Sequence, residues 1–330
     1  MGNENILEIF NLYVEYTSKK RVSHALNGIS LSIKRGETLG LVGETGAGKT
    51  TTALSILRLL PERTGHIRKG SIVFDGIELT SLSDIEMQAI RGGRISMIFQ
   101  DPMTALNPVI RVGNQIEEVL RLHNPERKSA EELAQYSEDM LKLVGINPER
   151  KNDYPHQFSG GMKKRIVIAM ALACSPELLI ADEPTTALDV TIQAQVLAMM
   201  AELKQRLGMA MIMITHDLGI IAKICDTVAV MYCGEIIESG AFEDLFVNKL
   251  HHPYTEGLFG SIPDIYGDEK RLHPISGMLP DPTDLPAGCK FNPRCPYCTE
   301  KCRTHHPQVY TNGTHQVCCH LFADKEGYHG

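Results

Sequence analysis

A glycine-rich stretch, GETGAGKT at residues 43–50, constrains the fold of this chain more than any other segment. A short apolar run, TLGLV, precedes it, and the helix-forming stretch TTALSILRLL follows it and ends before Pro61. The pattern G-x-x-x-x-G-K-[ST] between a strand and a helix is typical of a phosphate-binding loop. Its glycines let backbone N–H groups face phosphate oxygens, and the helix N-terminus adds a favourable dipole. The segment therefore predicts an α/β fold that binds a nucleotide.

The residues of this loop have predictable roles. Lys49 supplies a cation to the phosphates, and the hydroxyl of Thr50 can bind Mg²⁺. A chance glycine-rich turn explains the combination of strand, loop, Lys and Thr poorly. Tyr16, upstream of the loop, can stack on adenine, although Tyr13 is an alternative and so is a core role for Tyr16. We expect the phosphates to contact the loop and the residue after it: Gly43, Glu44, Thr45, Gly46, Ala47, Gly48, Lys49, Thr50 and Thr51.

A second apolar run, LLIADEP at residues 178–184, ends in two acids. Asp182 can hold Mg²⁺ through water, and Glu183 can polarise the water that attacks the γ-phosphate. Two solvated acids at a strand end would be the ordinary interpretation of this run taken alone. Together with the phosphate loop, the acids indicate a site that hydrolyses ATP.

Further polar residues also suit a phosphate site. Ser159, Gly160 and Gly161 in FSGGMKKR (158–165) open a predicted helix, which is another anion-binding terminus. One chain with one phosphate loop does not need a second phosphate-binding helix start of its own. We therefore expect two chains to sandwich ATP, each offering this second helix start to the nucleotide of the other. Gln100 and His216 each follow a short apolar run, RISMIF and MIMIT, at the sheet edge where α/β folds bind ligands. Taken singly, a capped helix and a structural histidine are the ordinary explanations.

The rest of the chain indicates where helices and hairpins lie. SIVFDGIEL (71–79) predicts strands that turn at Asp75-Gly76, and VAVMYCGEIIESG (228–240) predicts a hairpin that turns at Gly234. We expect residues 101–165 to form a mostly helical insertion. Within it, the segment 129–146 places five apolar side chains on one helical face: Leu133, Tyr136, Met140, Leu141 and Val144.

Charge and hydropathy narrow the class of protein. The net charge of −7 argues against a general nucleic-acid binder, whose domain is usually basic. The N-terminus lacks the basic segment and apolar core of a signal peptide. No apolar run approaches the roughly 18 residues of a membrane span. We therefore expect a soluble or peripheral protein of the cytosol.

Six of the nine cysteines lie between residues 289 and 319, beyond a composition shift near residue 250. In a reducing cytosol, clustered cysteines are more often metal ligands or redox centres than structural disulfides. Zinc is one candidate because Cys295 and Cys298 form a close pair. Free or paired thiols are another alternative. A zinc set would combine Cys295, Cys298 and Cys302 with a fourth ligand from Cys319, His305, His306, His315 and His320.

Taken together, residues 5–245 resemble the nucleotide-binding subunit of an ABC transporter. GETGAGKT resembles the Walker A loop, Gln100 the Q-loop, FSGGMKKR the signature, LLIADEP the Walker B strand, TALD (186–189) the D-loop and His216 the switch histidine. This resemblance implies a P-loop ABC-type nucleotide-binding domain, with a RecA-like α/β core, an antiparallel β subdomain and a helical subdomain at about 101–165. Lys164 stands where the family usually has Gln, so we expect altered contacts to ribose or to neighbouring residues.

The same resemblance implies the chemistry of the site. Glu183 would be the general base, and His216 and Gln100 would assist catalysis. ATP would bind the loop, Tyr16 and, from the other cassette, Ser159, Gly160 and Gly161. Mg²⁺ would be held by Thr50, Gln100 and Asp182.

A narrower resemblance covers FQDPMTALNPV (99–109), VMYCGEIIESG (230–240), HHPYTEGLFGSIP (251–263) and the cysteine-rich end. These segments resemble the ATP-binding subunits of oligopeptide, dipeptide and nickel importers. The resemblance implies a peripheral ATPase on the cytoplasmic face of the membrane that energises uptake of peptides or nickel. Its partners would be a homologous second ATPase subunit, two permease subunits and an extracytoplasmic substrate-binding protein, with no nucleic acid.

This narrower resemblance also divides the chain and selects a ligand set. Residues 1–250 would form the cassette, and residues 251–330 a small C-terminal region that binds a metal cluster. The implied cofactor is a [4Fe–4S] cluster held by Cys289, Cys295, Cys302 and Cys319, with Cys298 and Cys318 as additional cysteines. The alternative function is a soluble ABC ATPase that acts on nucleic acid and carries a zinc module.

Overall fold

The computed structural model describes residues 4–19, 21–101, 105–124, 126–186, 188–247, 250–260 and 275–330. The chain divides into two compact units, each assembled from separate segments of the sequence. The first comprises residues 1–7, 32–38 and 73–224, and the second comprises residues 8–31, 39–72 and 225–330. In the described part of the chain, no helix has the length and apolar character needed to cross a membrane.

The first unit is built around three parallel strands. β6 (Ile95–Ile98), β7 (Leu178–Asp182) and β8 (Ala210–Ile214) lie side by side in that order. Every residue of β7 and β8 is buried, which explains why these segments are continuously apolar and do not alternate. Helices α7 (Val190–Leu207) and α8 (Leu218–Ile224) follow β7 and β8 in the chain. The parallel arrangement brings the carboxyl ends of all three strands to one edge.

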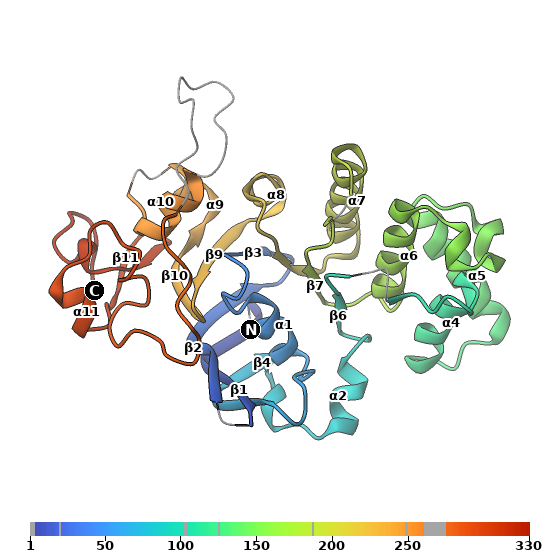
Figure 1. Ribbon diagram of the computed structural model, residues 1–330. Helices are drawn as coiled ribbons and strands as arrows, with labels where there is room; N and C mark the ends of the chain where they lie inside the picture. Colours follow the sequence, from blue (N-terminus) through green and yellow to red (C-terminus); the bar gives the residue numbers. More distant parts are fainter. Residues whose placement is uncertain are drawn as a thin grey trace. The chain divides into compact units, whose positions relative to one another are not determined.

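The predicted helical insertion consists of α4 (Val112–Leu122), α5 (Ala130–Leu143) and the start of α6 (Gly160–Leu172), with short 3₁₀ turns at Pro148–Asn152 and Pro155–Gln157. The three helices pack against one another (green in Figure 1). Residues 102–104 and 125 of the predicted insertion lie outside the described residues. The predicted insertion is thus helical where the structure describes it.

Helix α5 begins with a capping box, in which Ser129 and Glu132 bond each other's backbone N–H groups. Four of the five apolar side chains predicted for its buried face are buried: Leu133, Met140, Leu141 and Val144. The prediction for Tyr136 was wrong, because its side chain is exposed and its ring lies 5.1 Å from the ammonium of Lys128. The next residue, Ser137, is fully buried instead, and its hydroxyl donates to the carboxylate of Glu117 on α4 at 3.3 Å.

Strands β2 (Arg21–Lys34), β1 (Asn5–Ser18), β4 (Gly65–Phe74) and β5 (Ile77–Glu78) form a four-stranded sheet in the order β2-β1-β4-β5. β4 and β5 pair antiparallel through the predicted turn, where Asp75 and Gly76 have φ values of 49° and 78°. Two consecutive positive φ values are the hallmark of a tight two-residue hairpin turn. A 3₁₀ turn at Leu79–Ser81 and helix α2 (Asp84–Ile90) follow.

In the second unit, β3 (Thr38–Val42) pairs parallel with β9 (Thr227–Tyr232), and β9 pairs antiparallel with β10 (Glu235–Ala241). The predicted hairpin turn is confirmed, with φ values of 47° at Cys233 and 76° at Gly234. The C-terminal segment, residues 251–330, continues the sheet. In it, β12 (His315–Cys318) pairs with β10, and β11 (Val309–Asn312) pairs with β12. Helices α9 (Phe242–Val247), α10 (Pro253–Phe259) and α11 (Glu300–Thr304) and a 3₁₀ turn at His320–Phe322 complete the unit (orange to red in Figure 1).

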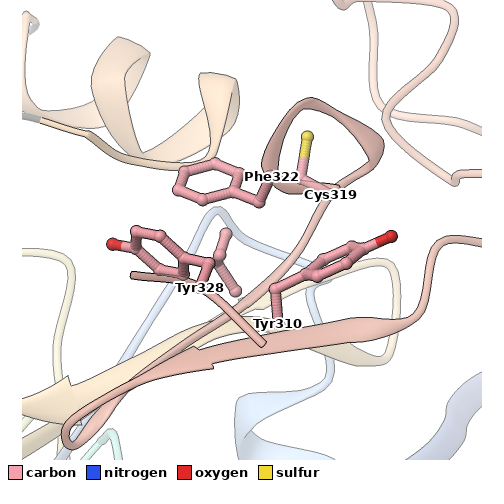
Figure 2. Close-up of a cluster of buried hydrophobic side chains, with 5 residues drawn as sticks. Tyr310, Cys319, Phe322 and Tyr328 are labelled. Atoms are coloured by element: carbon pink, nitrogen blue, oxygen red, sulfur yellow. The ribbon is translucent and has the colours of Figure 1, made fainter. Parts of the chain in front are cut away.

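The C-terminal segment also has a small apolar core, shown in Figure 2. Phe322 and Tyr328 meet edge to face with ring centroids 4.9 Å apart. Aromatic packing of this kind adds specific geometry to the burial of apolar surface. The core is a cluster of buried side chains: Tyr310, Val317, Cys319, Phe322 and Tyr328.

A buried carboxylate joins this segment to β10. Oε1 of Glu238 accepts hydrogen bonds from Nδ1 of His251 at 2.9 Å and Nε2 of His315 at 2.7 Å. Oε2 accepts from the backbone N–H of His252 at 2.9 Å. Burial acts to raise the pKa of Glu238, but the two histidine hydrogen bonds outweigh it and lower the pKa to about 2. The ionised carboxylate therefore anchors His315 of β12 and the start of α10 to the same strand.

Candidate nucleotide site

The phosphate loop links β3 to helix α1 (Lys49–Ile56), as predicted. Gly43 and Gly48 have φ values of 153° and 107°. A Cβ atom at Gly43 would lie 2.3 Å from the carbonyl oxygen of Met231, and one at Gly48 would lie 2.8 Å from that of Ala25. Positive φ and close backbone approach both exclude a side chain at these two positions. The tight course of the loop thus depends on glycine.

Lys49 lies inside the curve of the loop. Its side chain is buried, and its ammonium donates to the carbonyl oxygens of Gly43 at 2.6 Å and Glu44 at 3.0 Å. The N-cap residue of helix α1 is Gly48, which has no side chain to cap the helix, and the N-terminus of a helix is suited to an anion. A cation and a helix N-terminus are therefore adjacent, as a polyphosphate requires.

The remaining loop residues differ in their exposure to solvent. Thr45, Gly46 and Thr50 are exposed, whereas the side chain of Ala47 is fully buried. The hydroxyl of Tyr16 lies 3.4 Å from Oγ1 of Thr51, so this ring lies beside the start of α1. The second unit thus brings the predicted residues Tyr16, Thr51 and the loop together.

A second group of polar side chains meets at the carboxyl ends of β6, β7 and β8, in the first unit. The carboxylate of Glu183 accepts hydrogen bonds from Nε2 of Gln100 at 3.1 Å and Oγ1 of Thr186 at 2.9 Å. Nδ1 of His216 lies 3.0 Å from its other oxygen. Asp182 is the last residue of β7 and directly precedes Glu183 in the sequence, and it is buried. Gln100, Glu183 and His216 are therefore brought together as the strand pattern predicted.

The electrostatics keep Glu183 ionised. Burial acts to raise the pKa of Glu183, but hydrogen bonds from His216 and Thr186 outweigh burial and lower it below its ordinary value. An ionised carboxylate can only accept, so Nδ1 is the nitrogen of His216 that carries a proton. Glu183 also has a φ of 48°, a conformation that is rare outside glycine. The group can orient a water molecule and accept its proton.

The predicted helix terminus is present at α6. Oγ of Ser159 accepts from the backbone N–H of Met162 at 3.4 Å, and Gly160 and Gly161 form the first turn. Lys164, four residues into this helix, is buried and donates to the carbonyl oxygen of Thr186. Burial lowers the pKa of Lys164. This contact to Thr186 is one to a neighbouring residue, and the expected contact to ribose stays a prediction.

Thr186 was not predicted to take part in the site, yet it contacts both Glu183 and Lys164. It belongs to the segment TALD, in which Ala187 lies outside the described residues. At the end of this segment Asp189 caps α7, because its carboxylate accepts from the backbone N–H of Ile192 at 2.9 Å. The TALD segment is thus tied at both ends to helices of the first unit.

Two residues of the C-terminal segment reach the phosphate loop and were missed by the sequence reasoning. Arg294 binds the carboxylate of Glu44, and the hydroxyl of Tyr254 accepts from its backbone N–H. The sequence carries no local signal for a contact between positions 250 residues apart.

Backbone hydrogen bonds join some of the cysteines of the C-terminal segment. The backbone N–H of Cys289 donates to the carbonyl oxygen of Cys302 at 2.9 Å, and that of Cys298 donates to the carbonyl oxygen of Cys295 at 3.3 Å. Burial raises the pKa of Cys289 to about 11 and that of Cys319 to about 12. Cys298 lies beside Cys295, and its Sγ points to the carbonyl oxygen of Thr299 at 3.6 Å. All six cysteines of this segment carry free thiols.

Comparisons with known proteins assign the family. A model described as ABC transporter matches residues 26–186, and one described as oligopeptide/dipeptide transporter, C-terminal region, matches residues 237–302. The oligopeptide transport ATP-binding protein AppD of Bacillus subtilis is 46% identical over 323 residues, covering 97% of this chain and 98% of the relative. The dipeptide transport ATP-binding protein DppD of Bacillus subtilis is 48% identical over 321 residues, covering 96% and 95%. The chain belongs to the ATP-binding proteins of oligopeptide and dipeptide ABC transporters.

Solved structures agree with this assignment. The post-hydrolysis dimer of the ATP-binding cassette MJ0796, bound to ADP and phosphate, has a TM-score of 0.65 at 27% identity and covers 71% of this chain and 98% of its own. The protein cbiO1 of Clostridium perfringens, part of the ABC transporter complex cbiONQ, has a TM-score of 0.64 at 30% identity and covers 75% of this chain and 92% of its own. The α/β cassette fold that the family resemblance implied is confirmed. As a family member, this protein is an ABC-type ATPase.

Proposed function

We propose that this ABC cassette hydrolyses ATP to drive uptake of dipeptides or oligopeptides through a membrane transporter. The observation that carries the proposal is the ionised carboxylate of Glu183, held by Gln100, Thr186 and His216 at one edge of a parallel sheet. The names of AppD and DppD support the peptide cargo. Family membership disfavours the alternative of a soluble ATPase that acts on nucleic acid.

In the proposed reaction, the loop of residues 43–51 binds the phosphates, Lys49 neutralises their charge and Tyr16 stacks on adenine. Magnesium suits the hydroxyl and carboxylate oxygens of Thr50 and Asp182 and the amide oxygen of Gln100, and would neutralise charge on the transferred phosphoryl group. Glu183 accepts a proton from water as its oxygen attacks the γ-phosphorus, and the bond from phosphorus to the leaving ADP oxygen breaks. His216 orients the carboxylate through its protonated Nδ1.

A second cassette completes this proposal. Ser159, Gly160 and Gly161 form a helix start suited to the γ-phosphate of ATP bound to a partner cassette. The dimer of MJ0796 supports such a pairing. We propose a homologous ATPase subunit as partner, with two permease subunits and a substrate-binding protein, and a peripheral position on the cytoplasmic face. Residues 1–250 would act as the cassette and residues 251–330 as the C-terminal region.

For the C-terminal region we propose a structural [4Fe–4S] cluster on Cys289, Cys295, Cys302 and Cys319, with zinc as the alternative. The residues fit such a group, since all four are free cysteines of one unit and the backbone N–H of Cys289 donates to the carbonyl oxygen of Cys302 at 2.9 Å. Thiolates are the usual ligands of both groups. Iron and acid-labile sulfide should be present in anaerobically prepared protein, retained in Cys298→Ser and lost in Cys302→Ser. Stoichiometric zinc without sulfide would overturn the cluster.

The transport proposal is tested in proteoliposomes that contain the complete transporter with its permeases and binding protein. ATP-dependent accumulation of a labelled dipeptide or oligopeptide is the expected result, and Lys49→Ala should abolish it. Accumulation of nickel without any peptide uptake would overturn the peptide cargo. Accumulation of neither, with ATP still hydrolysed, would overturn the importer role.

A further inference from the structure

The carboxylate of Glu44, the second residue of the phosphate loop, is held by an arginine of the C-terminal segment. Nη1 and Nη2 of Arg294 donate to its two oxygens at 2.7 Å and 3.0 Å. This two-point pairing is stronger and more directional than a single charged contact. The side chain of Arg294 is 4% exposed and that of Glu44 is 31% exposed. The pair is therefore partly shielded from water and salt.

Arg294 is itself fixed by groups outside the loop. Its Nε donates to the carbonyl oxygen of Ser276 at 3.1 Å, and its Nη2 also donates to that of Ile275 at 3.4 Å. Its guanidinium lies 5.8 Å from the ring centroid of Tyr232 and donates to the hydroxyl of that residue at 3.4 Å. The guanidinium is therefore held by the C-terminal segment and β9 independently of its contact with the loop.

A second residue of the C-terminal segment holds the same loop position. The backbone N–H of Glu44 donates to the hydroxyl of Tyr254 at 2.8 Å. Tyr254 is fully buried, with ring centroids 4.7 Å from Tyr232 and 5.6 Å from Phe291. The main chain and the side chain of Glu44 are thus both anchored on rigid groups.

This anchoring reaches Lys49, since the carbonyl oxygen of Glu44 accepts from its ammonium at 3.0 Å. We propose that Arg294 is a positioning residue of the nucleotide site, which holds Glu44 so that the loop backbone and Lys49 are preorganised for the phosphates. The inference rests on the proposed binding of ATP by this loop. Preorganisation raises affinity because less freedom is lost when the ligand binds.

The first test is a titration of the full-length chain with a fluorescent ATP analogue. Arg294→Met should raise Kd about tenfold, which corresponds to about 1.4 kcal/mol. Arg294→Lys should be intermediate, because lysine is a point charge without the two-point fork. Arg303→Gln is the matched control, since this arginine of the same segment pairs with Glu300 at 3.2 Å on the exposed surface. It should bind with the parental Kd.

A double-mutant cycle separates positioning from folding. If Arg294 acts through Glu44, the rise in Kd for Arg294→Met combined with Glu44→Gln should be smaller than the product of the single effects. The thermal midpoint without nucleotide is measured for each variant, because a merely structural role lowers it and leaves Kd unchanged. Should Arg294→Met fail to fold, the comparison of Arg294→Lys with Glu44→Gln gives the answer.

The outcomes distinguish this inference from the proposed function. If Lys49→Ala loses binding while folded Arg294 variants keep the parental Kd, the positioning role is wrong and the nucleotide site stands. If Lys49→Ala binds as the parent does, the loop is not the nucleotide site and the proposed function fails first.

Discussion

Nδ1 of His216 lies 3.0 Å from the carboxylate of Glu183, and the side chain of the histidine is 69% exposed while that of the acid is 14% exposed. The acid is thus sheltered and the histidine faces solvent. Such a pair can hold an ionised base in place while its partner remains accessible to an approaching group.

Glu183→Gln tests the base. Glutamine keeps the size of the side chain, but its NH₂ group cannot accept the hydrogen bonds that one carboxylate oxygen accepts. Because glutamine also cannot accept a proton, turnover should fall by about 10²–10⁴-fold, the usual contribution of a positioned base. Nucleotide affinity should remain within about twofold. Steady-state ATP hydrolysis and a binding titration on the same preparation check both statements. Parental turnover in the variant would remove Glu183 from the reaction.

His216→Ala tests the electrostatics of the pair. Because His216 helps to lower the pKa of Glu183, its removal should raise that pKa. Activity that needs the carboxylate is lost as pH falls through this pKa, so the acidic limb of the rate profile should move to higher pH. The pH dependence of kcat is the measurement, and Lys223→Ala on α8 serves as a control in the same unit. An unmoved acidic limb would contradict the role of His216.

The lowered pKa of Glu238 predicts that the free energy of unfolding depends on pH. Its pKa is lowered from 4.5 to about 2, so its contribution is fully present above pH 4.5 and is lost as pH falls toward 2. The shift corresponds to about 3 kcal/mol at neutral pH. Urea unfolding of the parent and of Glu238→Gln, at pH 7 and at pH 3, should show the difference between them shrinking at low pH. An equal difference at both pH values would exclude the ionised carboxylate as the cause.

The substitution Gly43→Ala should push the phosphate loop out of place. Its Cβ would lie 2.3 Å from a carbonyl oxygen, so the loop must shift and binding of nucleotide should be lost. Gly36→Ala is the control, since Gly36 also has a positive φ, 73°, but has open space around it. The control should lose about 1 kcal/mol of stability and keep its affinity for nucleotide. Equal affinities for the two variants would contradict the role of close approach.

Local patterns predicted the elements that position the site. The continuous apolar runs of β7 and β8 and the glycines of the phosphate loop act within a few residues, so their effect is visible in sequence. Tyr136 was misplaced because helical periodicity gives a face but not the space that the opposite helices leave. The pairing of Arg294 with Glu44 joins distant positions and depends on the folded course of the whole second unit. The site residues that follow buried strands could be named, whereas their partners from the C-terminal segment could not.

The pairing of β12 with β10 has a practical consequence for the design of shorter proteins. A chain cut near residue 250 would lose His315 from Glu238 and would uncover the hydrogen-bonding edge of β10. An uncovered edge recruits strands from other molecules, so aggregation would be the expected fate of such a fragment. In the intact chain the outer strand is β11, only four residues long, which offers a poor template for self-association. The C-terminal segment is therefore also a solubility element, and fusion partners belong beyond it.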